Sequence, residues 1–131
     1  MGTPFYMAPE QAEDPGGVDT RADIYSFGAT FYHALTGKPP FEGATTYSIH
    51  YKHKTETLTS PQALRPGLSD RTSELLERCL AKAPQDRFSS FAEVLKHLQP
   101  TNEVTSPWAI SDDLALAPYL DRYRTRRASA I

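Results

Sequence analysis

The sequence has little of what disulfide-stabilised, membrane-spanning or nucleic-acid-binding proteins need. It holds one cysteine, Cys79, so no internal disulfide can form and nothing indicates an oxidising compartment. No apolar run approaches the roughly 20 residues of a membrane span, and the first residues lack the charged region and apolar core of a signal peptide. A net charge of −2 provides no general attraction to nucleic acid or to an anionic membrane. We therefore expect a location in the cytoplasm, or at the cytoplasmic face of a membrane.

The sequence also lacks the alternation of apolar and polar residues that is typical of a half-buried strand. Its apolar residues recur at helical spacing instead, and eleven prolines separate the helical segments and end several of them. These patterns predict an all-α fold class for the chain as given, with many loops.

The segment DTRADIYSFGATFYHALTG predicts a long helix with Asp19 or Thr20 as its N-cap and Gly37 as a left-handed C-terminal cap. Apolar residues cover one stripe and much of the opposite side: Ile24, Phe27, Phe31 and Leu35, then Tyr25, Ala29, Tyr32 and Ala34. A helix that is apolar nearly all round requires burial on every side. We expect that burial to need more chain than follows in this sequence.

Two amphipathic helices are predicted further on. DRTSELLERCLAK begins after Ser69 or Asp70 and carries Lys82 at its end. In SFAEVLKHLQP, Ser90 and Glu93 form a capping box, in which each side chain satisfies a backbone N–H near the helix start. Between these helices and the long one, residues 44–56 predict a modest surface helix, and residues 60–69 predict a loop.

Four motifs follow one another in a familiar order: GTPFYMAPEQ, DIYSFG, LTGKPPF and CLAKAPQDRF. Together they resemble the C-terminal half of a protein kinase catalytic domain, and their wording is most similar to the eukaryotic-like serine/threonine kinases of bacteria. The resemblance implies an incomplete, helical C-terminal lobe of the kinase fold over residues 1–98. Residues 99–131 are expected to form a linker and a basic tail.

The resemblance assigns a substrate-docking loop to the first residues of the chain. Gly2, Thr3, Pro4, Phe5 and Tyr6 match the loop that receives the substrate residue after the phosphorylated one, where the family's threonine hydroxyl contacts the catalytic aspartate. Tyrosine kinases carry a different stretch there, so the match implies a protein substrate phosphorylated on serine or threonine.

Four further residues are expected to support the active site. Ala8-Pro9-Glu10 matches the family's A-P-E signature, whose glutamate pairs with an arginine that corresponds to Arg87. Asp23 matches the aspartate of the central helix that binds the catalytic-loop backbone, although a charge in a first helical turn is favourable in any case. Gly28, about one turn on, would allow another element to pack closely.

No catalytic residue is identified in this chain. Phosphoryl transfer requires a glycine-rich loop, a strand lysine, a catalytic aspartate and carboxylates that hold metal ions. The sequence contains no G-x-G-x-x-G, V-A-I-K, H-R-D or D-F-G motif. We expect the chain alone to bind no cofactor and to be inactive, whereas the complete family domain uses ATP and Mg²⁺.

Three other signals are weaker. His50 and His53 share a helix face, but no third metal ligand accompanies them, and we expect solvated histidines and no metal site. Cys79 is expected to be a core residue. Arg126-Arg127-Ala128-Ser129 resembles a site for basophilic kinases, which makes Ser129 a candidate phosphosite. The same basic stretch is also typical of a solvated tail, or of a juxtamembrane segment if a membrane helix follows Ile131.

Two hypotheses of function remain. In the first, the chain is the C-terminal fragment of a serine/threonine protein kinase, Met1 is an internal methionine, and the missing N-terminal portion supplies ATP, metal and base. In the alternative, the chain is a non-catalytic kinase-like module that uses the docking surface as a scaffold. The alternative predicts a soluble, monomeric and cooperatively folded chain, and the first hypothesis predicts an exposed apolar helix that aggregates.

Overall fold

The computed structural model of the chain describes residues 3–14, 16–17 and 19–99. In chain order its elements are the 3-10 helix η1 (Pro4–Tyr6), α1 (Pro9–Glu13), α2 (Thr20–Thr36), α3 (Thr46–Thr55), α4 (Pro61–Leu64), α5 (Asp70–Cys79), the 3-10 helix η2 (Pro84–Asp86) and α6 (Phe91–Leu98). This part of the chain contains no strand, which confirms the predicted helical fold class. The predicted basic tail with Ser129, and Gly2 of the docking loop, lie outside the described residues.

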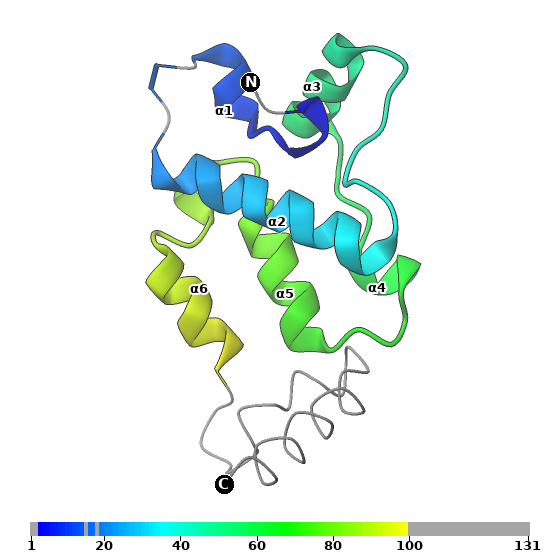
Figure 1. The fold of residues 1–131 in the computed structure, drawn as a ribbon, viewed down its shortest axis with the longest axis vertical. Coiled ribbons are helices and arrows are strands. Elements are labelled where there is room, and N and C mark those ends of the chain that lie inside the picture. The colour runs from blue at the N-terminus through cyan, green and yellow to red at the C-terminus, as the bar shows by residue number, and fades with distance from the viewer. Residues whose placement is uncertain (1–2, 15, 18, 100–131) are drawn as a thin grey trace, which may run out of the picture. The chain divides into compact units, whose positions relative to one another are not determined.

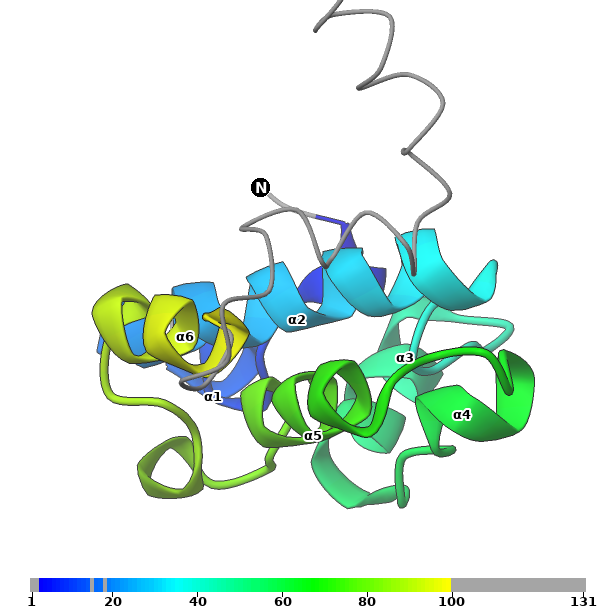
Figure 2. The same cartoon turned by 90° about the horizontal axis from the view of Figure 1, so that it is seen from below.

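Helix α2 runs through the middle of the compact unit Met1–Leu98 (Figure 1). Helices α1 and α3 lie on one side of α2, and α5 and α6 lie on the other. Figure 2 shows the same order from below, with α5 between α4 and α6. Contacts join α2 to η1, α4 and α5, and α3 to η1 and α1. The start of the chain is therefore packed against both α2 and α3.

The ends of α2 follow the predicted caps. The Asp19 carboxylate accepts a hydrogen bond from the Arg21 N–H at 2.9 Å, and Gly37 ends the helix with a φ of 82°. Only glycine adopts that conformation without strain. The buried residues of α2 are Ala22, Ile24, Tyr25, Gly28, Ala29, Tyr32 and Leu35.

Burial of α2 on every side is not found among the described residues. Phe27 and Phe31 are half-buried and stack on each other with ring centroids 5.7 Å apart, while Asp23, Thr30 and Ala34 are exposed. Phe91 of α6 meets the Phe27 ring edge-on at 5.9 Å. One face of the helix therefore carries apolar rings that the described part of the chain only partly covers.

Gly28 lies where α2 and α5 cross. A Cβ atom added at this position would lie 2.5 Å from the Cβ atom of Cys79, closer than real Cβ contacts. The two helices thus approach at a distance that only glycine permits here. Around this crossing, Leu75, Leu76 and Cys79 of α5 are fully buried, and each large apolar side chain contributes about 1.5–3 kcal/mol through the hydrophobic effect.

The prediction of solvated histidines on α3 is wrong for His53, which is 0% exposed. Tyr47 and Tyr51 do face solvent, as expected of a surface helix, but Ile49 and His53 are buried. Residues four apart share one face of a helix, and this face packs toward η1 and α2. A helix with few apolar residues therefore still has a buried side.

The sequence predicts a loop over residues 60–69, but the short helix α4 occupies Pro61–Leu64. Proline is common at the first position of a helix, because an N–H group at that position has no hydrogen-bond partner within the helix. The N-cap of α5 is Ser69, whose hydroxyl accepts from the Thr72 N–H at 3.2 Å.

The predicted capping box at α6 is half right. The Ser90 hydroxyl accepts from the Glu93 N–H at 3.3 Å, but the Glu93 carboxylate accepts from the Ser89 N–H at 3.1 Å and does not bind Ser90. Among the apolar residues of α6, Val94 is buried and Leu95 is 59% exposed. No helix of the described part combines the length and the apolar character that crossing a bilayer requires.

Candidate functional site

The described part of the predicted docking loop is a single turn of 3-10 helix. Pro4 begins η1, where its fixed φ is compatible with a helix start. Thr3 is exposed, its hydroxyl accepts from the Phe5 N–H at 3.5 Å, and its carbonyl accepts from the Tyr6 N–H at 3.2 Å. Local hydrogen bonds thus form this turn and leave Thr3 at the surface.

Two contacts attach the turn and the segment after it. The Tyr6 hydroxyl lies 2.8 Å from Nδ1 of His33, near the C-terminal end of α2. Ala8, which is fully buried, donates its backbone N–H to the Gln11 side chain at 3.1 Å. The loop is therefore connected to the central helix on one side and to α1 on the other.

Glu10 and Arg87 form a bidentate ion pair. The two terminal guanidinium nitrogens of Arg87 donate to the two carboxylate oxygens of Glu10 at 2.8 and 2.9 Å. The Arg87 side chain is completely buried and that of Glu10 is 27% exposed. Arg87 also lies over the Tyr25 ring, with its guanidinium carbon 4.8 Å from the ring centroid. This pair connects α1 to the segment just before α6.

Backbone carbonyls satisfy the rest of the Arg87 guanidinium. Nε donates to the Ala81 carbonyl at 2.8 Å, and the terminal nitrogens donate to the carbonyls of Arg21 and Lys82 at 3.0 and 3.1 Å. With the two bonds to Glu10, these account for all five N–H groups of an arginine side chain. Removal of one partner from such a buried pair typically costs about 3–5 kcal/mol.

A buried aromatic cluster joins α2 to α3. The Tyr25 hydroxyl lies 2.6 Å from Nδ1 of His53, and the Phe41 ring meets the His53 ring edge-on at 5.0 Å. Burial, with a smaller contribution from the positive charges of Lys82 and His50, lowers the pKa of His53 to about 4, against the opposing effect of the Pro4 and Phe5 backbone. Burial also raises the pKa of Tyr25 well above its usual value. His53 is therefore a neutral imidazole near neutral pH.

Lys82 caps the C-terminal end of α3, whereas the sequence predicts it only as a charge at the end of α5. Its ammonium group donates to the carbonyls of Lys52 and His53 at 3.2 and 2.7 Å, and it lies 4.1 Å from the centroid of the Phe41 ring. Burial lowers the pKa of Lys82 to about 8, against the opposing effect of the Glu56 charge. Cations are favoured at the unpaired carbonyls of a helix end.

The sequence-predicted support residues do not all meet. Glu10 and Arg87 are in contact, and Gly28 lies at the crossing of α2 and α5. Asp23 lies in the first turn of α2, is exposed, and its carboxylate makes no hydrogen bond within the described part of the chain.

No sequence motif marks Tyr25, His53 or Lys82 as parts of this site. His53 lies four residues after Ile49, and that spacing is the one signal of its buried face. The sequence pattern places Tyr25 only among the apolar residues of its helix. No sequence pattern connects Lys82 with the end of α3, because the two segments meet only through the tertiary fold.

No three His, Cys, Asp or Glu side chains among residues 3–14, 16–17 and 19–99 are grouped so that they could hold a metal ion. Nδ1 of His50 and Nε2 of His53 are buried without a hydrogen bond in that part of the chain. Burial raises the pKa of the Cys79 thiol to about 12, so it remains protonated, as befits a core residue.

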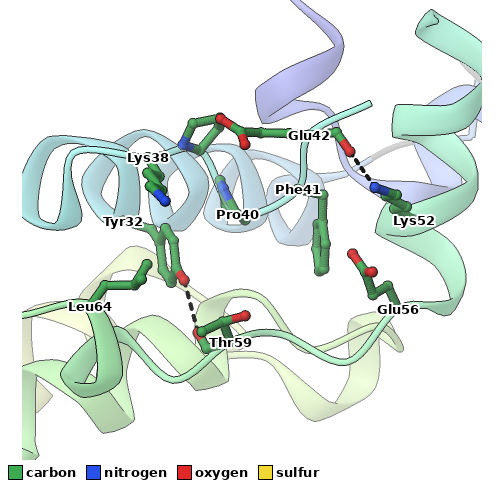
Figure 3. A pocket seen from close by; sticks show the side chains of 10 residues that line it. Tyr32, Lys38, Pro40, Phe41, Glu42, Lys52, Glu56, Thr59 and Leu64 are labelled. Carbon is green, nitrogen blue, oxygen red and sulfur yellow. Dashed lines mark hydrogen bonds between the residues drawn. The ribbon is translucent and has the colours of Figure 1, made fainter. Parts of the chain in front are cut away.

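A small hollow opens beside the C-terminal end of α2 (Figure 3). Its volume is about 250 Å³, below the roughly 300–1,000 Å³ that is usual for small-molecule sites. The Tyr32 hydroxyl donates to the Thr59 carbonyl across it at 2.8 Å. The charged residues that line it are Lys38, Glu42, Lys52 and Glu56. Because both signs of charge are equally present, the hollow provides no selective attraction for an ionic ligand.

The sequence is similar to that of known proteins. Residues 1–98 match the model of the protein kinase domain family. The chain is 40% identical over 129 residues to the DNA damage-responsive serine/threonine-protein kinase RqkA of Deinococcus radiodurans, a match that covers 98% of this chain and 18% of that protein. It is also 40% identical over 94 residues to the serine/threonine-protein kinase PknB of Mycobacterium tuberculosis, covering 72% of this chain and 15% of that protein.

A third relative is the probable serine/threonine-protein kinase PknB of Bifidobacterium longum, which is 40% identical over 93 residues. That match covers 71% of this chain and 13% of the relative. The chain thus spans less than a fifth of the length of the relatives it matches. The helical fold, the ordered motifs and the family match agree, and the chain belongs to the protein kinase domain family, in its bacterial serine/threonine type.

Proposed function

We propose that this chain supplies the substrate-docking loop of a serine/threonine protein kinase and residues that support its active site. Chain outside these 131 residues would bind ATP and Mg²⁺ and supply the catalytic base. The complete enzyme would transfer a phosphoryl group from ATP to serine or threonine in a protein. This chain alone would bind part of the protein substrate and transfer nothing.

The observation that carries this proposal is the bidentate pair between Glu10 and Arg87. It anchors the segment that directly follows the docking loop to a buried arginine with no unmet N–H group. A docking loop must hold one geometry if it is to align a substrate hydroxyl, because small displacements of a reacting group slow a reaction strongly. A bidentate pair fixes both distance and orientation between the two segments.

The exposure of Thr3 and Asp23 supports their proposed roles. In the proposed enzyme the Thr3 hydroxyl contacts a catalytic aspartate from outside this chain. Asp23 would accept hydrogen bonds from the backbone of the loop that carries this aspartate. Both side chains are exposed at the surface of the described part of the chain, where a further segment could reach them.

The half-buried rings on α2 support the need for further chain. Phe27 and Phe31 present an apolar surface that Phe91 covers only at one edge. Apolar surface of this kind usually marks a contact with another segment or partner. We propose that chain outside these 131 residues covers it.

Peptide titration tests the docking function. The ¹⁵N-labelled chain is titrated with a serine-containing peptide, and amide chemical shifts are followed by NMR. We expect the largest changes at Thr3, Phe5 and Tyr6, and smaller ones when Thr3 is replaced in T3A. Changes confined to the α3 surface around Tyr47 and Tyr51, with none in the loop, would contradict the proposal.

A further inference from the structure

His33 lies in the last turn of α2, and its ring faces the docking loop. Nδ1 of the imidazole is 2.8 Å from the Tyr6 hydroxyl, and the two half-buried rings are tilted by 42° with their centroids 5.9 Å apart. The His33 carbonyl accepts the Gly37 N–H at 2.9 Å in the C-terminal cap of the helix. The cap holds the backbone of His33, so its ring gives the Tyr6 hydroxyl a partner at a fixed position.

The segment from Tyr6 to Glu10 runs between the two ends of α2. Arg87, which binds Glu10, also donates to the Arg21 carbonyl in the first turn of α2 at 3.0 Å, whereas Tyr6 binds His33 in the last turn. Figure 1 shows α1 toward the start of α2 and the dark-blue first residues farther along it. The segment is therefore attached near both ends of the central helix.

The distances that these two attachments span require an extended segment. Helix α2 rises about 18 Å over the twelve residues between its two attachment points, and the four residues from Tyr6 to Glu10 reach at most about 14 Å. The long side chains at both ends make up the difference. Met7 and Ala8 have extended backbones, with φ and ψ of −83° and 132° and of −65° and 148°. The segment is thus drawn out along α2.

The turn η1 has little internal support of its own. The Tyr6 N–H donates to the Thr3 carbonyl at 3.2 Å, and the Phe5 N–H donates to the Thr3 hydroxyl at 3.5 Å. A single helical turn is unfavourable alone, because few hydrogen bonds offset the fixing of several backbone dihedrals. Its conformation therefore depends on its attachment to the rest of the fold, and the Tyr6 hydroxyl provides such an attachment through His33.

We propose that His33 is a positioning residue for the docking loop: through Tyr6 it anchors η1 to the end of α2, so that Thr3 keeps one position. The inference rests on the proposed docking function. The Glu10–Arg87 pair holds the segment after the loop. Without His33 the loop would remain attached there, but its turn would be free to move, and a peptide would bind less tightly.

The first test compares two variants of nearly equal side-chain shape. H33N keeps an oxygen acceptor near the position of Nδ1, whereas H33L has none. Leucine is the better helix former, so a defect confined to H33L cannot come from a weakened helix. Because the Tyr6 N–H closes the turn, its hydrogen exchange measures the order of the loop. We expect this exchange to accelerate roughly fivefold in H33L, as for the loss of one hydrogen bond, and to change less in H33N.

Two other amides serve as internal controls. The Asp14 N–H donates to the Glu10 carbonyl at the end of α1, and the Gly37 N–H donates to the His33 carbonyl. We expect neither exchange rate to change in H33L, because both helices keep their own hydrogen bonds. Equal Tyr6 exchange in wild type and H33L would overturn the proposal. Acceleration at Gly37 that matches that at Tyr6 would also overturn it, because the end of α2 would then have frayed.

The second test compares two tyrosines of α2 and the loop. Y6F and Y32F each remove one hydroxyl that makes a 2.8 Å hydrogen bond, but that of Tyr32 goes to the Thr59 carbonyl in the segment before α4. The dissociation constant of the serine-containing peptide should rise several-fold in Y6F and remain unchanged in Y32F. The double variant Y6F/H33L should bind no more weakly than either single variant, since both substitutions remove the same bond. Equal effects of Y6F and Y32F, or additive effects of Y6F and H33L, would overturn the proposal.

These readouts separate the inference from the proposed function. If the wild-type chain does not bind the peptide, the docking function fails, whereas the exchange rates still decide whether His33 holds the loop. If the peptide binds and the exchange rate of Tyr6 is the same in wild type and H33L, the positioning role fails and the docking function stands.

Discussion

Glu10 and Arg87, 77 residues apart in the sequence, share two parallel hydrogen bonds of 2.8 and 2.9 Å. The pair joins the first described segment of the chain to the segment before its last described helix. The remaining N–H groups of the Arg87 guanidinium donate to three backbone carbonyls, and the guanidinium lies over the Tyr25 ring. Helix α1, the central helix α2 and the segment before α6 therefore meet at one buried arginine.

Replacement of this arginine should destabilise the chain strongly. In R87A, Glu10 and three backbone carbonyls lose their partner, and we expect the free energy of unfolding to fall by about 3–5 kcal/mol. Urea unfolding followed by circular dichroism measures this. R78A is the matched control, because Arg78 is exposed and lies over the Phe88 ring, a contact worth about 0.5–1 kcal/mol. Equal losses in both variants would remove the structural role assigned to the pair.

A methyl group at the crossing of α2 and α5 should also destabilise the fold. In G28A the new Cβ would lie 2.5 Å from the Cβ atom of Cys79, so the helices must separate, at a cost of about 1–3 kcal/mol. G67A is the control, since a Cβ atom at Gly67 meets no atom within 4 Å. If G28A unfolds at the same urea concentration as wild type, the helices do not approach as closely as described.

Acid should weaken the fold through His53. Its pKa is about 4 in the folded chain against an ordinary value of 6.5, so between these values the unfolded chain binds the extra proton and the folded chain does not. Stability therefore falls as the pH falls through this window, by about 2 kcal/mol between pH 7 and pH 5 from this one group. Urea unfolding at the two pH values should show a smaller loss in H53N. An identical loss in wild type and H53N would place the titrating group elsewhere.

The apolar face of α2 and α6 should make the purified chain self-associate. Phe91 and Leu95 are 39% and 59% exposed, and Phe27 and Phe31 lie half-buried nearby in the fold. Sedimentation velocity should reveal association that increases with concentration, and the double substitution F91S/L95Q should reduce it, with little change in secondary structure. A monodisperse, cooperatively melting monomer would instead favour the non-catalytic scaffold module.

Local rules predict much of this fold. The ends of α2 follow from Asp19 and Gly37, and the start of α5 follows from Ser69, because capping depends on residues within one turn. The approach of Glu10 to Arg87 was expected only from the family resemblance, since no local signal connects residues so far apart.

The environment of His53 could not be predicted in the same way. Its helix has few apolar residues, and burial there depends on Tyr25, Phe41 and the docking loop meeting in three dimensions. The position of Lys82 over the end of α3 has the same origin. At α6, the carboxylate of Glu93 accepts from the N–H of Ser89 and not from that of Ser90. This difference of one residue lies within the usual variation of helix starts.

The central claim is that this chain docks and supports a protein substrate but carries no machinery for phosphoryl transfer. The most direct measurement incubates the purified chain with radiolabelled ATP, Mg²⁺ and a generic protein substrate, beside a complete bacterial serine/threonine kinase as the positive control. We predict labelled substrate with the complete kinase and none with this chain at any concentration. Magnesium-dependent labelling that increases with the concentration of this chain would contradict the claim.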